Sequence, residues 1–114
     1  MFGFERLGPY QKAEDYVIKV YEILNGIRGD YELKDQLKRA SLSITCNLAE
    51  GYSRMTPKDQ KHFFTMARSS LHECASLVTI LFRLGHIKAS VKDEMIGSLS
   101  SISAFLWKMI KHRE

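Results

Sequence analysis

The residues best suited to chemistry are polar side chains that recur along one side of a helical segment. At a rotation of about 100° per residue, Arg39, Ser43, Asn47 and Glu50 cluster beside an apolar seam. Carboxylates such as Glu50 and Glu73, with an amide nearby, could serve a hydrolase or a nuclease. The same groups could instead hydrogen-bond to one another at the border of a core.

The second interpretation requires a partner for each charged group. Glu73 and Ser70 hold the equivalent border position on the next helical segment. A partly buried arginine needs an anion, and a partly buried carboxylate needs donors, so Arg39 should pair with Glu73 or Glu50. We predict that this network fixes the register of two helices. Its members are Arg39, Ser43, Asn47, Glu50, Ser70 and Glu73.

A catalytic interpretation lacks supporting motifs. The chain contains no GxxxxGK[ST], GxGxxG, HExxH or GxSxG, and no glutamate precedes a histidine by three residues as in di-iron bundles. Arg68 and His72 are spaced more closely than the arginine and histidine of some helical-bundle ribonucleases. We therefore predict no catalytic residue, no metal and no cofactor. A small hydrolase or nuclease with a site around Glu50 and Glu73, or a purely structural protein, is the alternative.

Four amphipathic segments must position these residues. Pro9 suits a first helical turn, and the glycines of "NGIRGD" end the first helix. Thr56 with Asp59 is typical of a helix start, and Ser90 with Asp93 repeats the pattern. The sequence predicts helices over about 9–27, 31–52, 57–84 and 91–111 in one domain, 1–114. Short connections make the fold an all-α, antiparallel, up-down-up-down four-helix bundle. The predicted core seams include Tyr21 of the first helix, Met66 and Leu84 of the third and Phe105 of the fourth.

Composition narrows the class further. Hydrophobic residues make up 45% of the 114 residues, and 17 lysines and arginines against 13 acids give a net charge of +4. No apolar run is long enough to span a membrane and the N-terminus does not look like a leader, so we expect a cytoplasmic protein with no membrane partner. Cys46 and Cys74 fall in apolar helical patterns, which favours reduced thiols.

A second apolar surface lies off the core seams. Leu42, Cys46 and Ala49 repeat at i, i+4 and i+7 on the far side of the second helix. Ile96 and Trp107 on the fourth helix also lie off their seam. We predict that these residues form the interface of a homo-oligomer.

Two stretches resemble a known family. "LKRASLSITCNLAEGYSR" and "FFTMARSSLHECASLVTILFRLGHI" are similar to the bacterial four-helix bundle proteins encoded in intervening sequences of large-subunit ribosomal RNA genes. The Asn-x-Ala-Glu-Gly core, which begins at Asn47, carries most of this resemblance. Leu48, Cys46 and Ser69 depart mildly from the usual pattern.

The resemblance implies a ring, commonly a homopentamer. One similar branch contains the accessory proteins of diversity-generating retroelements, basic barrels that bind a reverse transcriptase and nucleic acid. On this basis we expect a non-enzymatic binding module that binds RNA, DNA or a nucleic-acid enzyme such as a reverse transcriptase. Candidate nucleic-acid contacts are Arg54, Lys58, Lys61 and Arg68.

Overall fold

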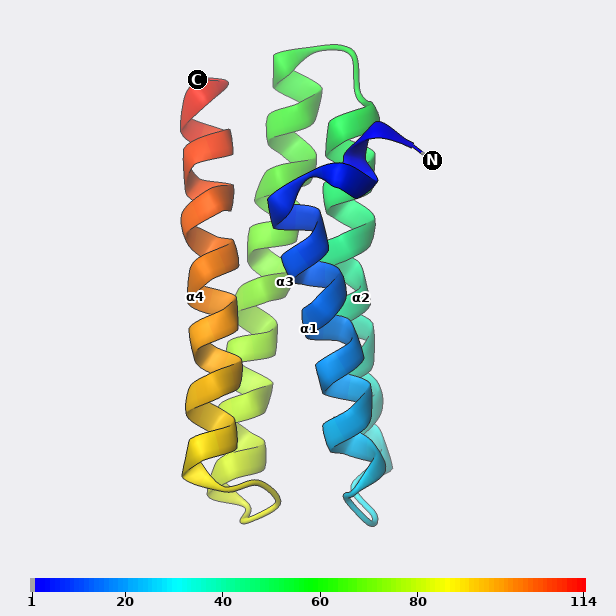
Figure 1. Ribbon diagram of the computed structural model, residues 1–114, viewed down its shortest axis with the longest axis vertical. Helices are drawn as coiled ribbons and strands as arrows, with labels where there is room; N and C mark the ends of the chain where they lie inside the picture. The colour runs from blue at the N-terminus through cyan, green and yellow to red at the C-terminus, as the bar shows by residue number, and fades with distance from the viewer. Residues whose placement is uncertain (1) are drawn as a thin grey trace.

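The computed structural model describes residues 2–114, which form four α-helices and one short 3-10 helix. The α-helices are α1 (Gly8–Asn25), α2 (Tyr31–Ser53), α3 (Pro57–Arg83) and α4 (Ala89–His112), and the 3-10 helix η1 spans Gly3–Arg6. Each α-helix begins and ends within two residues of the position expected from the sequence. The predicted all-α four-helix bundle is confirmed (Figure 1).

The helices run up and down in chain order. Helix α1 packs beside α2 and α4, and α3 packs beside the same two helices. The bundle measures 44 × 26 × 21 Å. The α2–α3 connection and the described ends of the chain lie at one end of the bundle, and the other two connections lie at the opposite end (Figure 1). The first of these two ends therefore brings the start of α3 close to the end of α4.

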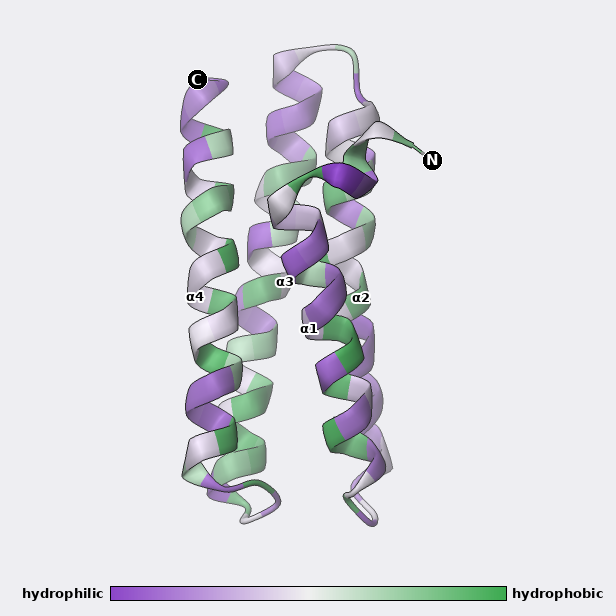
Figure 2. Ribbon diagram, in the orientation of Figure 1, coloured by the Kyte–Doolittle hydropathy of each residue, from purple (hydrophilic) through white to green (hydrophobic). Residues whose placement is uncertain are grey.

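All four helices contribute to one apolar core. Hydropathy alternates along each helix, as expected of amphipathic segments (Figure 2). The largest fully buried side chains include Phe64 of α3, Leu37 and Ile44 of α2, Leu24 of α1 and Leu106 of α4. Burial of these groups is the main favourable contribution to folding.

Four residues assigned to the core from the sequence are exposed. The exposed fractions of Tyr21, Met66, Leu84 and Phe105 are 36%, 41%, 58% and 38%, so their predicted burial is wrong. The apolar arc of α3 is wider than the part of its surface that α2 and α4 cover. The uncovered apolar part of this arc faces outward beside α2.

One of the two predicted helix caps is present in the structure and the other is not. The backbone N–H of Asp59 donates a hydrogen bond to Thr56 Oγ1 at 3.2 Å, which confirms the predicted cap of α3. Helix α4 instead begins at Ala89 after Lys88, with no side-chain cap. The predicted Ser90 cap is wrong because the helix starts one residue before this serine, which then lies inside the first turn.

A polar pair lies inside the core. Tyr16 of α1 and Cys74 of α3 have exposed fractions of 2% and 0%. The Tyr16 hydroxyl lies near the Cys74 thiol but has no hydrogen-bond partner in residues 2–114. Burial raises the pKa of the Cys74 thiol to about 12, and Glu73 adds to this shift. Burial also raises the pKa of Tyr16.

Candidate functional site

The polar stripe predicted from the sequence divides into two parts. The first part links α2 to α3: the hydroxyls of Ser43 and Ser70 are 2.8 Å apart and share a hydrogen bond. The Asn47 amide donates to the Ser43 carbonyl at 2.9 Å and to its hydroxyl at 3.0 Å. These three half-buried side chains lie together, as expected, between the two helices.

The charged members of the stripe lie elsewhere. Arg39 and Glu73 are exposed, and the predicted Arg39–Glu73 ion pair is wrong, because neither side chain forms an ion pair within residues 2–114. Glu50 is also exposed and accepts a hydrogen bond at 2.8 Å from Arg54, the residue that follows the end of α2. The physical reason is exposure: a charged group that remains in water needs no buried counterion.

The candidate nucleic-acid contacts differ in how their charge is balanced. Arg54 is paired with Glu50 and lies over the ring of Phe63, with its guanidinium carbon 4.5 Å from the ring centroid. Lys58 is exposed at the start of α3. Arg68 is half-buried and has no carboxylate partner among the described residues. Arg68 and Lys58 therefore carry charge that is not paired within residues 2–114.

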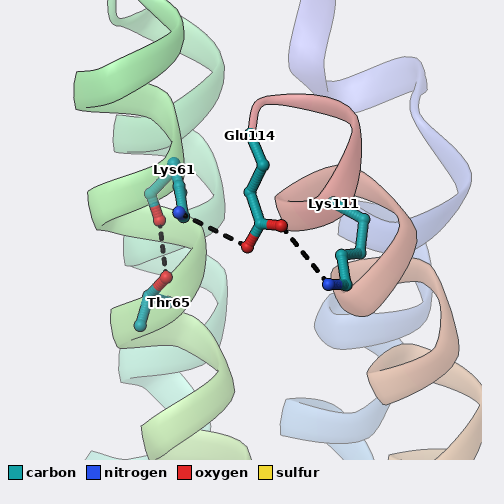
Figure 3. A network of polar contacts seen from close by, with 4 residues as sticks. All are labelled: Lys61, Thr65, Lys111 and Glu114. Carbon is teal, nitrogen blue, oxygen red and sulfur yellow. Dashed lines mark hydrogen bonds and ion pairs between the residues drawn. The ribbon is translucent and has the colours of Figure 1, made fainter.

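The fourth candidate belongs to a network that crosses from α3 to the end of the chain. Lys61 Nζ lies 3.4 Å from one carboxylate oxygen of Glu114, and Lys111 Nζ lies 3.3 Å from the other. Thr65 donates a hydrogen bond to the Lys61 carbonyl at 2.8 Å. Figure 3 shows the two lysines approaching the Glu114 carboxylate from different helices. The hydrogen bond from Lys111 lowers the pKa of Glu114, and Lys61 adds to this effect.

An aromatic ring lies next to this network. Lys111 Nζ is 4.9 Å from the centroid of the Trp107 ring, and the Arg68 guanidinium carbon is 5.6 Å from it. Trp107 is 49% exposed. The sequence reasoning missed Lys111 and Glu114, although Trp107, Lys111 and Glu114 recur at i, i+4 and i+7 and could have been found as one helix face.

The predicted oligomer-interface residues differ in how much of each side chain is exposed. Leu42 is 40% exposed, Cys46 is exposed and Ala49 is half-buried, so the outer side of α2 is an accessible apolar row. Ile96 is half-buried and packs against the core beside α3, so less of its surface than that of Leu42 is open to a neighbouring subunit. Trp107 contacts cations rather than this apolar row.

Two hollows lie on the surface of the bundle. One, of about 290 Å³, lies between α1 and α4 and is lined by charged residues including Lys19 and Glu94, which form an ion pair at 3.3 Å. The other, of about 260 Å³, lies between α3 and α4 and is lined by His72, Ser100 and Ser103 above Ile96 and Leu99. Neither hollow is lined by Glu50 or Glu73, the residues of the hydrolase alternative.

The described part of the chain holds no group of three or more His, Cys, Asp or Glu residues placed to bind a metal ion. Within the same residues, no helix has the length and hydropathy that a membrane crossing would need.

The fold defines the class as an antiparallel helical bundle with an accessible, basic and aromatic side between α3 and α4. Residues 5–108 match the model of the 23S rRNA-intervening sequence protein family, and the chain belongs to this family. The resemblance stated from the sequence is thereby confirmed.

A solved structure has the same fold. It is a protein of unknown function from the S23 ribosomal protein family of Bacteroides thetaiotaomicron. It superposes with a TM-score of 0.85 at 18% identity, over 90% of this chain and 98% of the other. Among curated proteins, none matches this chain.

Proposed function

We propose that the protein is a non-enzymatic, homo-oligomeric binding module that binds RNA or DNA in the cytoplasm. The oligomer is a ring, with five subunits as the resemblance implies. A nucleic-acid enzyme such as a reverse transcriptase is a further partner of the same basic surface. The family name links its members to intervening sequences of 23S rRNA, which supports a nucleic-acid role for this chain.

The observation that carries the binding proposal is the gathering of cations on α3 and α4. Arg68 and Lys111 lie over one exposed indole, and Glu114 is the acidic group that pairs with Lys111 and with Lys61. Cations that outnumber the nearby acids attract phosphates, and their attraction falls with added salt. A net charge of +4 per subunit would multiply around a ring.

The assembly proposal rests on exposed apolar side chains. A ring forms through a head-to-tail contact between two different surfaces of the subunit. The outer side of α2 supplies one such surface, with Leu42, Cys46 and Ala49. Helix α3 and the residue after it supply another, because Met66, Ile80 and Leu84 are 41%, 42% and 58% exposed. Covering both surfaces in a ring would remove apolar area from water.

Light-scattering mass and oligonucleotide binding test the two parts together. The mass of the purified chain should be about five times that of the subunit, and RNA or DNA affinity should fall steeply with rising salt. Leu42→Glu should reduce the mass, whereas Gln36→Glu, an exposed site on the same helix, adds the same charge and should not. A monomer that binds neither RNA nor DNA would overturn the proposal.

A further inference from the structure

We propose that the groove between α3 and α4 binds single-stranded nucleic acid, with a backbone phosphate replacing Glu114 between Lys61 and Lys111 and a base stacked on Trp107. By the α3/α4 groove we mean the surface that carries the contacts of Lys61, Arg68, Trp107 and Lys111, together with the hollow that His72 and Ser103 help to line. The inference rests on the proposed function. It adds that the nucleic acid is single-stranded, that it binds between α3 and α4, and that the Glu114 carboxylate competes with it.

The Glu114 carboxylate shows where an anion is held. Its two oxygens lie 3.4 Å and 3.3 Å from ammonium groups that come from two different helices. The three side chains are 40% to 52% exposed, so the contacts form at the surface, where ion pairs are weak and exchange readily with other anions. A phosphate has the same charge-assisted hydrogen bonding as a carboxylate. Glu114 therefore occupies a position that a nucleic-acid phosphate can take.

Trp107 provides the second element of a single-strand site. The indole is 49% exposed and lies within 5.6 Å of two cationic groups. The buried Nε atom of Arg68 has no hydrogen-bond partner in residues 2–114, so part of this cation is unsatisfied in the free chain. Proteins that bind single strands combine cations along the backbone path with aromatic rings on which bases stack.

The hollow of about 260 Å³ extends this path along the same two helices. His72 lies one turn beyond Arg68 on α3, and Ser103 lies one turn before Trp107 on α4. The hollow has an apolar floor, Ile96 and Leu99, and polar groups at His72, Ser100 and Ser103. An unstacked base presents an apolar face and a hydrogen-bonding edge, which this lining complements.

The same features favour a single strand over a duplex and over a second copy of the chain. Bases in a duplex are already stacked on one another and cannot lie on an indole without being extruded. A second copy that covered Trp107 would have to desolvate the cations of Arg68 and Lys111 that lie over its ring. The apolar rows on α2 and α3 offer that copy better surfaces.

Trp107 is the single tryptophan of the chain, so its fluorescence reports on this groove alone. The experiment titrates the full chain with twelve-nucleotide uridine RNA, thymidine DNA of the same length, and a blunt RNA duplex. Both single strands should quench the fluorescence, and the duplex should bind about tenfold more weakly. Added salt should reverse the quenching.

Charge variants locate the phosphate. Lys61→Ala and Arg68→Ala should each lower the slope of log affinity against log salt by about one. Lys19→Ala removes an equally charged residue that pairs with Glu94 between α1 and α4, and it should leave the binding unchanged. Glu114→Gln should raise the affinity about two- to fivefold, whereas Glu94→Gln should not.

The possible results separate this inference from the proposed function. Oligonucleotide binding without a change in Trp107 fluorescence, and with full affinity in Arg68→Ala, would overturn the groove but leave the binding module intact. Absence of binding at low salt would overturn both. Dissociation of the oligomer by Trp107→Leu, in a variant with unchanged helical content, would show that a second copy covers the indole and would also overturn the groove.

Discussion

Gly51 of α2 lies directly against the ring of Phe64 of α3. A Cβ atom placed on Gly51 would be 2.5 Å from Cε1 and 2.7 Å from Cδ1 of that ring. The same ring makes an edge contact with Tyr52, at 5.2 Å between centroids, and lies 4.8 Å from the Arg113 guanidinium carbon. The glycine of the Asn-x-Ala-Glu-Gly core thus lets α2 and α3 approach each other around one buried phenylalanine.

Gly51→Ala should therefore destabilise the bundle. The added methyl group forces the Phe64 ring or the helix backbone to move, and such overpacking costs about 1–3 kcal/mol. Urea unfolding followed by circular dichroism measures the loss. Gly97→Ala is the matched control, because Gly97 lies exposed in α4 with no atom within 4 Å of the new methyl group. This control should stabilise the helix by about 0.5–1 kcal/mol. Equal effects at both sites would contradict the packing argument.

The Ser43–Ser70 hydrogen bond should couple the stability of α2 to that of α3. In a double-mutant cycle with Ser43→Ala and Ser70→Ala, we expect a coupling free energy of about 0.5–1.5 kcal/mol. Ser43→Ala alone should cost more than Ser70→Ala, because it also removes a hydroxyl that accepts from Asn47. Chemical unfolding of the four proteins gives the coupling.

The corresponding cycle for Arg39 and Glu73 is the control. Both side chains are exposed, so each alanine variant should change the free energy of unfolding by less than about 0.5 kcal/mol, without coupling. Coupling between Arg39 and Glu73, or none between Ser43 and Ser70, would contradict the arrangement described for the stripe.

The buried Cys74 thiol should make the stability fall at alkaline pH. Its pKa rises on folding from 9.0 to about 12, so the folded state retains a proton that the unfolded state releases. The stability that the neutral buried thiol provides is complete below pH 9.0 and is lost as the pH rises toward 12. In this range the free energy of unfolding falls by at most about 1.4 kcal/mol per pH unit. The raised pKa of Tyr16 acts in the same direction above pH 10.0.

Urea unfolding between pH 8 and pH 11 measures this slope. Cys74→Ala should make the slope shallower, whereas Cys46→Ala, at an exposed thiol, should not change it. In the native wild-type chain a thiol reagent should modify Cys74 only on unfolding. Modification of Cys74 in the folded chain would contradict its burial.

Helix bounds were predictable because the signals that start and end a helix are local. Thr56, Pro57 and Asp59 follow one another, and the cap forms as expected. Ser90 shows where this reasoning fails: Ala89 and Ser90 extend the helix backward without a side-chain cap, and Ile87 packs against the core just before them. The local preference of Ser90 for the N-cap position is weak, and packing around the connection before α4 overrides it.

The candidate site was predictable only in part. A helical wheel placed Ser43, Asn47 and Ser70 together, and the two serine hydroxyls meet at 2.8 Å. The wheel did not predict that Arg39 and Glu73 would extend into water. It also did not predict that Glu114 would lie between Lys61 and Lys111. Long charged side chains have many rotamers. The spacing of residues in the sequence therefore gives the side of the helix from which a side chain projects, but not which group its charged end contacts.

By itself, the sequence determined the helical class, the order of the helices, most core residues and the family. Those properties follow from hydrophobic periodicity and short connections, which act within one helix or between neighbours in the chain. Only the tertiary structure decided which apolar residues of α3 stay exposed, which helix covers Ile96, and which carboxylate meets Lys61 and Lys111. These outcomes depend on the separation and rotation of packed helices, since coverage and charge pairing arise from residues that are distant in the chain.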